Sequence, residues 1–155
     1  MQKKIIIILL ICFKFGFSQE RNTHKIEIET NIVYLPNLSV SYLYSYHSQL
    51  GIVIGTPRFN YYFKSNQPVI EPFFKTFFSK KKQNRGLFYG VSFPIGENKN
   101  NNKWSINATL LFGYKWVFNH GWTISYQGER SINLQTEELT TNIIGLQIGK
   151  RFTLK

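Results

Sequence analysis

A strict alternation of apolar and polar side chains over residues 104–118 is the sequence feature that most restricts the fold. One side of this segment is apolar throughout, and it consists of Trp104, Ile106, Ala108, Leu110, Phe112, Tyr114, Trp116 and Phe118. The other side is small or polar apart from Leu111 and Val117. A period of two belongs to a β-strand with two different faces, and no long stretch of the chain has the spacing of an amphipathic helix. The segment therefore predicts a long strand between an apolar and a polar environment.

The same alternation returns in other segments, and turn-forming residues separate them. The breaks give eight strands, at residues 24–35, 38–46, 50–64, 68–79, 86–95, 103–118, 121–132 and 140–154. Pro57 and Pro72 fall inside the third and fourth of these, where a proline predicts a bulge or a strand end. Eight evenly spaced strands predict a single all-β domain, either a barrel or a sandwich.

Composition excludes several other kinds of protein. The chain has 155 residues, of which 43% are hydrophobic and 17% aromatic, and this is too apolar for a disordered polypeptide. A single cysteine cannot form a disulfide framework. Residues that favour strands, such as Tyr, Phe, Ile and Thr, outnumber the strong helix formers, which argues against a helix bundle.

Residues 1–18 have the layout of a secretory signal peptide. Two lysines near the start precede an apolar run at 5–13, and small residues stand just before a cleavage point ahead of Gln19. The apolar run is too short for a membrane anchor, which needs about 20 residues. Cys12 follows an isoleucine rather than the small residue of a lipoprotein signal. We therefore expect removal of the signal peptide and export of residues 19–155 as a β-barrel domain.

Three features favour a transmembrane barrel over a soluble one. The polar faces of the strands are rich in Gly, Ser, Thr, Asn and Gln, and charged residues make up only 17% of the chain, whereas about 25–35% of a soluble surface is charged. Large aromatic residues stand at the ends of the apolar runs and predict a girdle at the membrane interfaces: Trp104, Trp116, Phe118, Trp122 and Phe152. Eight strands of about 11 residues also meet the length that a tilted membrane strand requires. We therefore expect a single eight-stranded antiparallel up-and-down barrel in the outer membrane, with its lipids as partners.

One hairpin also carries a family resemblance. The segment Phe112-Gly113-Tyr114-Lys115-Trp116, followed by Asn119-His120-Gly121-Trp122, resembles a hairpin of small outer-membrane β-barrel proteins of a Bacteroidetes-type, Gram-negative family of unknown function. Residues 70–75 and 85–90 are similar to the preceding strands of that family, and the resemblance extends over residues 40–155. It implies an outer-membrane barrel and no particular activity. One departure is that the chain continues for three residues after Phe152, whereas membrane barrels commonly end on an aromatic residue.

The lumen of an eight-stranded barrel is filled by side chains and forms no open pore. Charged residues on the inward faces must therefore pair with one another. The candidates for such ion pairs are Glu27, Glu29, Glu71, Lys75, Lys115, Glu129 and Arg151. They predict either an ion-pair core that stiffens the barrel or a ligand-binding interior, and the narrow lumen favours the first.

The only dense run of positive charge lies in residues 79–85, which include three consecutive lysines. In an exported protein, this segment suits anionic headgroups, a glycan or an envelope protein better than nucleic acid, so we expect no nucleic-acid partner. A solvated turn without a partner is the simpler interpretation. The sequence leaves open both this turn and a binding segment.

The sequence predicts no enzyme, metal site or cofactor. His24 falls near the start of the exported chain, and His47 and His120 fall in two turns, with no aspartate in the chain to orient them. No metal-ligand spacing and no glycine-rich phosphate loop occurs.

Two alternatives to a structural or binding outer-membrane barrel remain. A soluble, exported barrel of the lipocalin type would bind a small apolar ligand; it places Ile106, Leu110, Phe112, Ile144 and Ile148 inside and Asn107, Thr109 and Gln147 in water. An outer-membrane lipid hydrolase or acyltransferase would need a histidine and a nucleophile at one rim.

Overall fold

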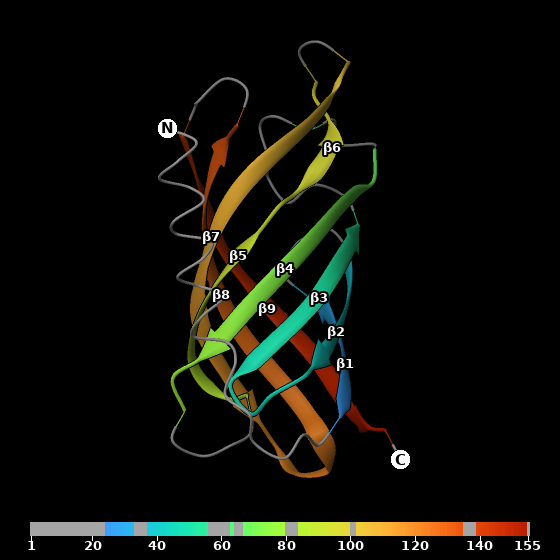
Figure 1. Ribbon diagram of the computed structural model, residues 1–155, viewed down its shortest axis with the longest axis vertical. Coiled ribbons are helices and arrows are strands. Elements are labelled where there is room, and N and C mark those ends of the chain that lie inside the picture. Colours follow the sequence, from blue (N-terminus) through green and yellow to red (C-terminus); the bar gives the residue numbers. More distant parts are fainter. Residues whose placement is uncertain are drawn as a thin grey trace.

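Figure 1 shows the computed structural model of the protein, which describes residues 24–32, 37–55, 63, 67–79, 84–99, 102–134 and 139–154. The predicted signal peptide at residues 1–18 lies outside these residues, and so do Pro57 and the three lysines of the 79–85 segment.

The described residues form nine β-strands and one short 3-10 turn. They are β1 (Lys25–Asn31), β2 (Asn37–Leu43), β3 (Ser48–Gly55), β4 (Val69–Phe77), β5 (Gly86–Ser92), β6 (Ile95–Glu97), β7 (Trp104–Val117), η1 (Asn119–Gly121), β8 (Trp122–Asn133) and β9 (Leu139–Thr153). All pairings are antiparallel; β1 pairs with both β2 and β9, and β3 pairs with β4. The sheet therefore closes into an eight-stranded barrel with one additional strand (Figure 1), and the prediction of a single all-β, eight-stranded antiparallel barrel is confirmed.

The additional strand, β6, continues β5 along the barrel wall. Both strands pair with β7 in one continuous register. The ladder is interrupted at Pro94, which has no N–H to donate, although its carbonyl accepts a hydrogen bond from the N–H of Asn107 at 3.0 Å. Together β5 and β6 correspond to the strand predicted at residues 86–95, with an extension to Glu97.

The prediction that Pro72 marks a bulge or a strand end is wrong. Pro72 lies inside β4, opposite Ile52 of β3. Its carbonyl accepts a hydrogen bond from the N–H of Phe93 at 3.0 Å, and in an antiparallel ladder the nitrogen of the same residue faces the same neighbour. The missing N–H thus falls at the gap between β5 and β6, so β4 passes through the proline without a bulge.

The structure describes only part of the strand predicted at residues 50–64. β3 begins at Ser48 and ends at Gly55, and most of the remaining segment lies outside the described residues. Phe63 is described, and it forms an isolated antiparallel bridge with Asn98.

The two ends of the barrel differ in their connections (Figure 1). The terminal end, at the bottom of the view, holds residues 24 and 154 and the connections 44–47, 78–85 and 118–121. The loop end holds the connections 32–36, 56–68, 98–103 and 134–138. Most connections at the terminal end are tight turns, whereas the longest connection of the barrel lies at the loop end.

The strands turn their polar faces inward and their apolar faces outward. On β7, Leu110 and Phe112 are 58% and 59% exposed, whereas Asn107 and Thr109 between the apolar positions are buried. Exposed apolar residues occur all around the wall, and they include Ile28, Val40, Leu50, Ile52, Ile54, Ile70, Leu87, Ile106, Trp116, Trp122, Tyr126 and Phe152. This is the reverse of the arrangement that the lipocalin-type alternative requires for β7.

Candidate functional site

The alternation in β1 places two carboxylates inside the barrel. Glu27 and Glu29 point inward and are buried, while Ile28 between them is exposed on the outer surface. β1 pairs with β9 so that Glu29 lies opposite Gly149. A Cβ atom at Gly149 would stand 2.5 Å from the Cγ atom of Glu29, so the glycine provides the space that this carboxylate occupies.

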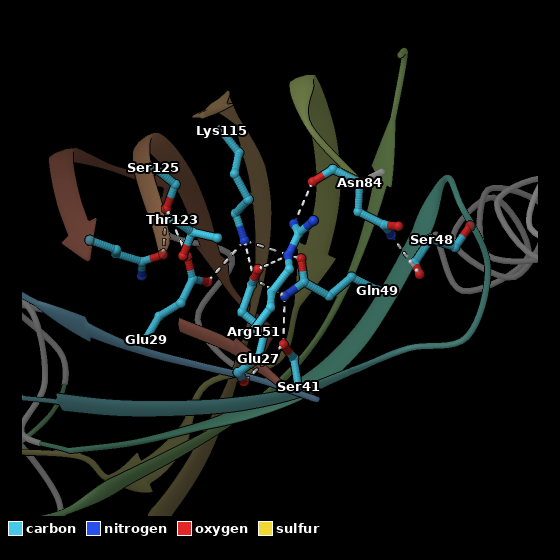
Figure 2. A network of polar contacts seen from close by, with 11 residues as sticks. Glu27, Glu29, Ser41, Ser48, Gln49, Asn84, Lys115, Thr123, Ser125 and Arg151 are labelled. Atoms are coloured by element: carbon cyan, nitrogen blue, oxygen red, sulfur yellow. Dashed lines mark hydrogen bonds and ion pairs between the residues drawn. The ribbon is translucent and has the colours of Figure 1, made fainter. Parts of the chain in front are cut away.

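Lys115 of β7 lies at the centre of the polar network in Figure 2. Its Nζ atom forms ion pairs with Glu27 and with Glu29, the latter at 3.0 Å to Oε2. It also donates a hydrogen bond of 3.3 Å to the Oε1 atom of Gln49 on β3. The Lys115 side chain is fully buried, so its charge depends on these acceptors rather than on water.

Arg151 of β9 is the second cation of this network. Its Nε atom forms an ion pair with Glu27, so that this carboxylate lies between two cations. Two carboxylates and two cations therefore balance within the network, as a buried charge cluster requires.

Neutral side chains complete the coordination of the two carboxylates (Figure 2). Gln49 donates hydrogen bonds to Glu27 at 2.7 Å and to the Ser41 hydroxyl at 2.5 Å. Ser125 and Thr123 on β8 donate to Oε1 of Glu29 at 3.3 and 3.5 Å. The network thus links β1, β2, β3, β7, β8 and β9 across the lumen.

The connection between β4 and β5 joins the network through Asn84. The Asn84 carbonyl accepts a hydrogen bond of 2.7 Å from Nη2 of Arg151, and its side-chain amide donates one of 2.9 Å to the carbonyl of Ser48. Its N–H donates to the carbonyl of Tyr46 at 2.8 Å. Asn84 is buried with φ +46°, a conformation that asparagine tolerates better than most residues. Asn84 therefore attaches the last part of this connection to Tyr46, Ser48 and Arg151 at the terminal end.

Aromatic rings line the lumen beside the network. Nζ of Lys75 lies 4.7 Å from the ring centre of Phe73 and 5.0 Å from that of Phe88. Nζ of Lys115 lies 5.7 Å from the ring centre of Phe77. All three rings are buried, so side chains in cation–π contact occupy this part of the interior.

The other two candidate carboxylates, Glu71 and Glu129, accept hydrogen bonds from neutral side chains. Glu71 of β4 accepts a hydrogen bond of 2.6 Å from Ser92. Glu129 of β8 accepts one of 2.8 Å from the amide of Gln127. Of the seven residues predicted as interior ion-pair candidates, the ion pairs given above join Glu27, Glu29, Lys115 and Arg151.

Sequence reasoning missed the neutral members of the network. Gln49 and Asn84 fall in or next to predicted turns, and the serines and Thr123 carry no charge that would single them out. Only Asn84 had a signal, because asparagine in a predicted turn suits a left-handed backbone position, which Asn84 adopts.

The residues predicted as an aromatic girdle are exposed on the outer wall: Trp104, Trp116, Phe118, Trp122 and Phe152. Trp104 begins β7 at the loop end, and the other four lie toward the terminal end. There Nζ of Lys150 stands 4.9 Å from the ring centre of Trp122.

The three histidines all lie at the terminal end. His24 hydrogen-bonds to the hydroxyl of Tyr42 and stacks on its ring, His47 lies in the β2–β3 connection, and His120 lies in η1. Among the described residues, no group of three or more His, Cys, Asp or Glu is arranged to hold a metal ion.

Within the same part of the chain, no helix has the length and apolar character needed to cross a membrane. Comparison with models of known families, with curated proteins and with solved structures gave no match for the chain.

Proposed function

We propose that the protein is an integral outer-membrane β-barrel with a closed lumen and a structural or binding role. The observation that carries the proposal is the polarity of the wall: exposed apolar side chains surround the barrel, while paired charges fill its interior. An apolar surface that continues around a monomer is characteristic of contact with lipid.

The connections support an orientation of the barrel in the membrane. Outer-membrane barrels have short periplasmic turns and longer external loops. On this basis the terminal end faces the periplasm and the loop end faces the exterior. The 78–85 connection is the long exception at the terminal end, and Asn84 ties its last part to the barrel wall.

A binding role is assigned to the loops rather than to the lumen. The described interior is occupied by the ion-pair network and by Phe73, Phe77 and Phe88, which leaves the loop end as the surface for an envelope protein or glycan. The proposal includes no catalytic step and no cofactor.

Fractionation of the expressed protein tests the localisation. We expect it in the outer membrane after carbonate washing, with a gel mobility that shifts on boiling. Recovery in the soluble periplasmic fraction would contradict the proposal.

A matched pair of substitutions on β7 and its end tests the contact with lipid. Phe112→Lys places a charge in the middle of the apolar face, and Phe118→Lys places the same charge at the terminal rim. In a membrane, a lysine costs about 2–4 kcal/mol at the midplane and about 0–1 kcal/mol near the interfaces. We therefore expect Phe112→Lys to reduce folding into vesicles much more than Phe118→Lys. Equal effects would indicate a surface in water, where both phenylalanines are exposed.

A further inference from the structure

The outer wall carries few charges. Among the outward-facing strand residues that the structure describes, the cations are Arg130 of β8 and Lys150 of β9. A charge on this wall is costly inside the apolar layer of a membrane and costs little at the border of that layer. The position of each cation along its strand therefore indicates how deep that part of the wall lies in the membrane.

Lys150 indicates the border at the terminal end. It lies opposite Trp122 in the β8–β9 ladder, and its ammonium group stands over the Trp122 ring. A tryptophan with a cation at the end of an apolar face is typical of the headgroup layer. The pair therefore gives a reference level for the rest of β8.

Arg130 lies eight residues further along β8 than Trp122. At about 3.4 Å per residue this is roughly 27 Å along the strand. A strand tilt of about 35–45° reduces it to roughly 20 Å along the membrane normal, within an apolar band about 25 Å tall. Arg130 therefore lies in the upper part of the band, within reach of the border at the loop end.

Among the residues that the structure describes, the charge of Arg130 has no partner on the wall. Arg130 is exposed, and its partner in the β7–β8 ladder is Leu110, which is also exposed. No ion pair or hydrogen bond joins the Arg130 side chain to another residue that the structure describes. In lipid, such a guanidinium extends along the wall to the nearest anion.

We propose that Arg130 binds the phosphate of an anionic lipid in the leaflet at the loop end. A guanidinium matches the geometry of a phosphate with two parallel N–H donors, and Leu110 would contact the acyl chain of the same lipid. This inference rests on the proposed function, because it needs the wall to face a bilayer. The inference goes beyond the proposed function because it names the class of lipid that Arg130 binds and the leaflet that contains this lipid.

Native mass spectrometry of the refolded barrel, released from micelles that contain phosphatidic acid and phosphatidylcholine, tests the inference. We expect the wild type to retain phosphatidic acid and Arg130→Gln to retain about tenfold less. Arg130→Lys keeps the charge but not the paired donors, so it should show an intermediate loss. Lys150→Gln removes the same charge at the other border and should change retention less than twofold.

Equal retention by the wild type and Arg130→Gln overturns the inference, and so does an equal loss in Lys150→Gln. Each variant is first shown to be folded by its shift in mobility on boiling. If the wild type itself does not insert into bilayers, the proposed function fails, and this result is distinct from a folded wild type without lipid selectivity at Arg130.

Discussion

Replacement of Lys115 by methionine should destabilise the barrel strongly, because it removes one of two cations from a closed network. Methionine preserves most of the side-chain volume but not the ion pairs with Glu27 and Glu29. Arg151 still compensates Glu27, whereas Glu29 retains only the hydroxyl groups of Thr123 and Ser125 at 3.5 and 3.3 Å. An unpaired buried charge of this kind costs about 3–5 kcal/mol.

The double variant Lys115→Met with Glu29→Gln should recover much of this loss. It returns the network to one carboxylate, Glu27, and one cation, Arg151, and leaves hydrogen-bonding groups around residue 29. We expect a coupling energy of at least about 2 kcal/mol between the two substitutions, in the range for residues in direct contact. Lys150→Met is the matched control, because its cation–π contact with Trp122 lies on the outer wall and contributes about 0.5–1 kcal/mol.

Guanidinium unfolding of the barrel in lipid vesicles, followed by tryptophan fluorescence, measures these free energies. The mobility shift on boiling provides an independent measure of the folded fraction. The reasoning is refuted if Lys115→Met costs no more than Lys150→Met, or if Glu29→Gln adds to the damage instead of reducing it.

Three further predictions address positions outside that pair, each measured by the same unfolding assay. Asn84→Ala should cost about 1–2 kcal/mol, since it removes the hydrogen bond to the Ser48 carbonyl and disfavours φ +46°; a neutral result would mean that this connection is not fastened. Asn107→Leu should be neutral or stabilising, because both polar atoms of its buried amide have no hydrogen-bond partner among the described residues. Asn133→Leu should cost about 1 kcal/mol through the loss of its bond to Ser105; the opposite order would contradict this reasoning. Gly51→Ala should be destabilising, since a Cβ atom there would stand 2.6 Å from the Phe73 ring; unchanged stability would contradict this close approach.

The sequence predicted the strands well where one period dominates and poorly where prolines interrupt it. The strand predicted at residues 103–118 differs from β7 by one residue at each end. At Pro72 local reasoning was wrong, because the effect of a missing N–H depends on which neighbour it faces. The register of the barrel determines which neighbouring strand the proline nitrogen faces, and the sequence of one strand does not give this register.

In the interior network too, the sequence of one strand predicts which way a side chain points, but not which residue it contacts. Alternation places Glu27 and Lys115 on inward faces, but 88 residues separate them in the chain, and only closure of the barrel brings them together. The contributions of Gln49 and Asn84 depend on the paths of two connections at the terminal end. Charged members could therefore be selected from the sequence, whereas their neutral partners could not.

Alternation by itself does not tell which face of a barrel meets water, since a soluble and a membrane barrel show the same period. The charges on the polar faces carry the missing information. Charges that face water need no partners, whereas charges inside a narrow lumen must balance and touch. Here Glu27 and Glu29 meet Lys115 and Arg151 in a balanced, buried cluster drawn from three strands. Such pairing places the polar face on the inside, and the apolar face that remains outside is the observation on which the proposed contact with lipid rests.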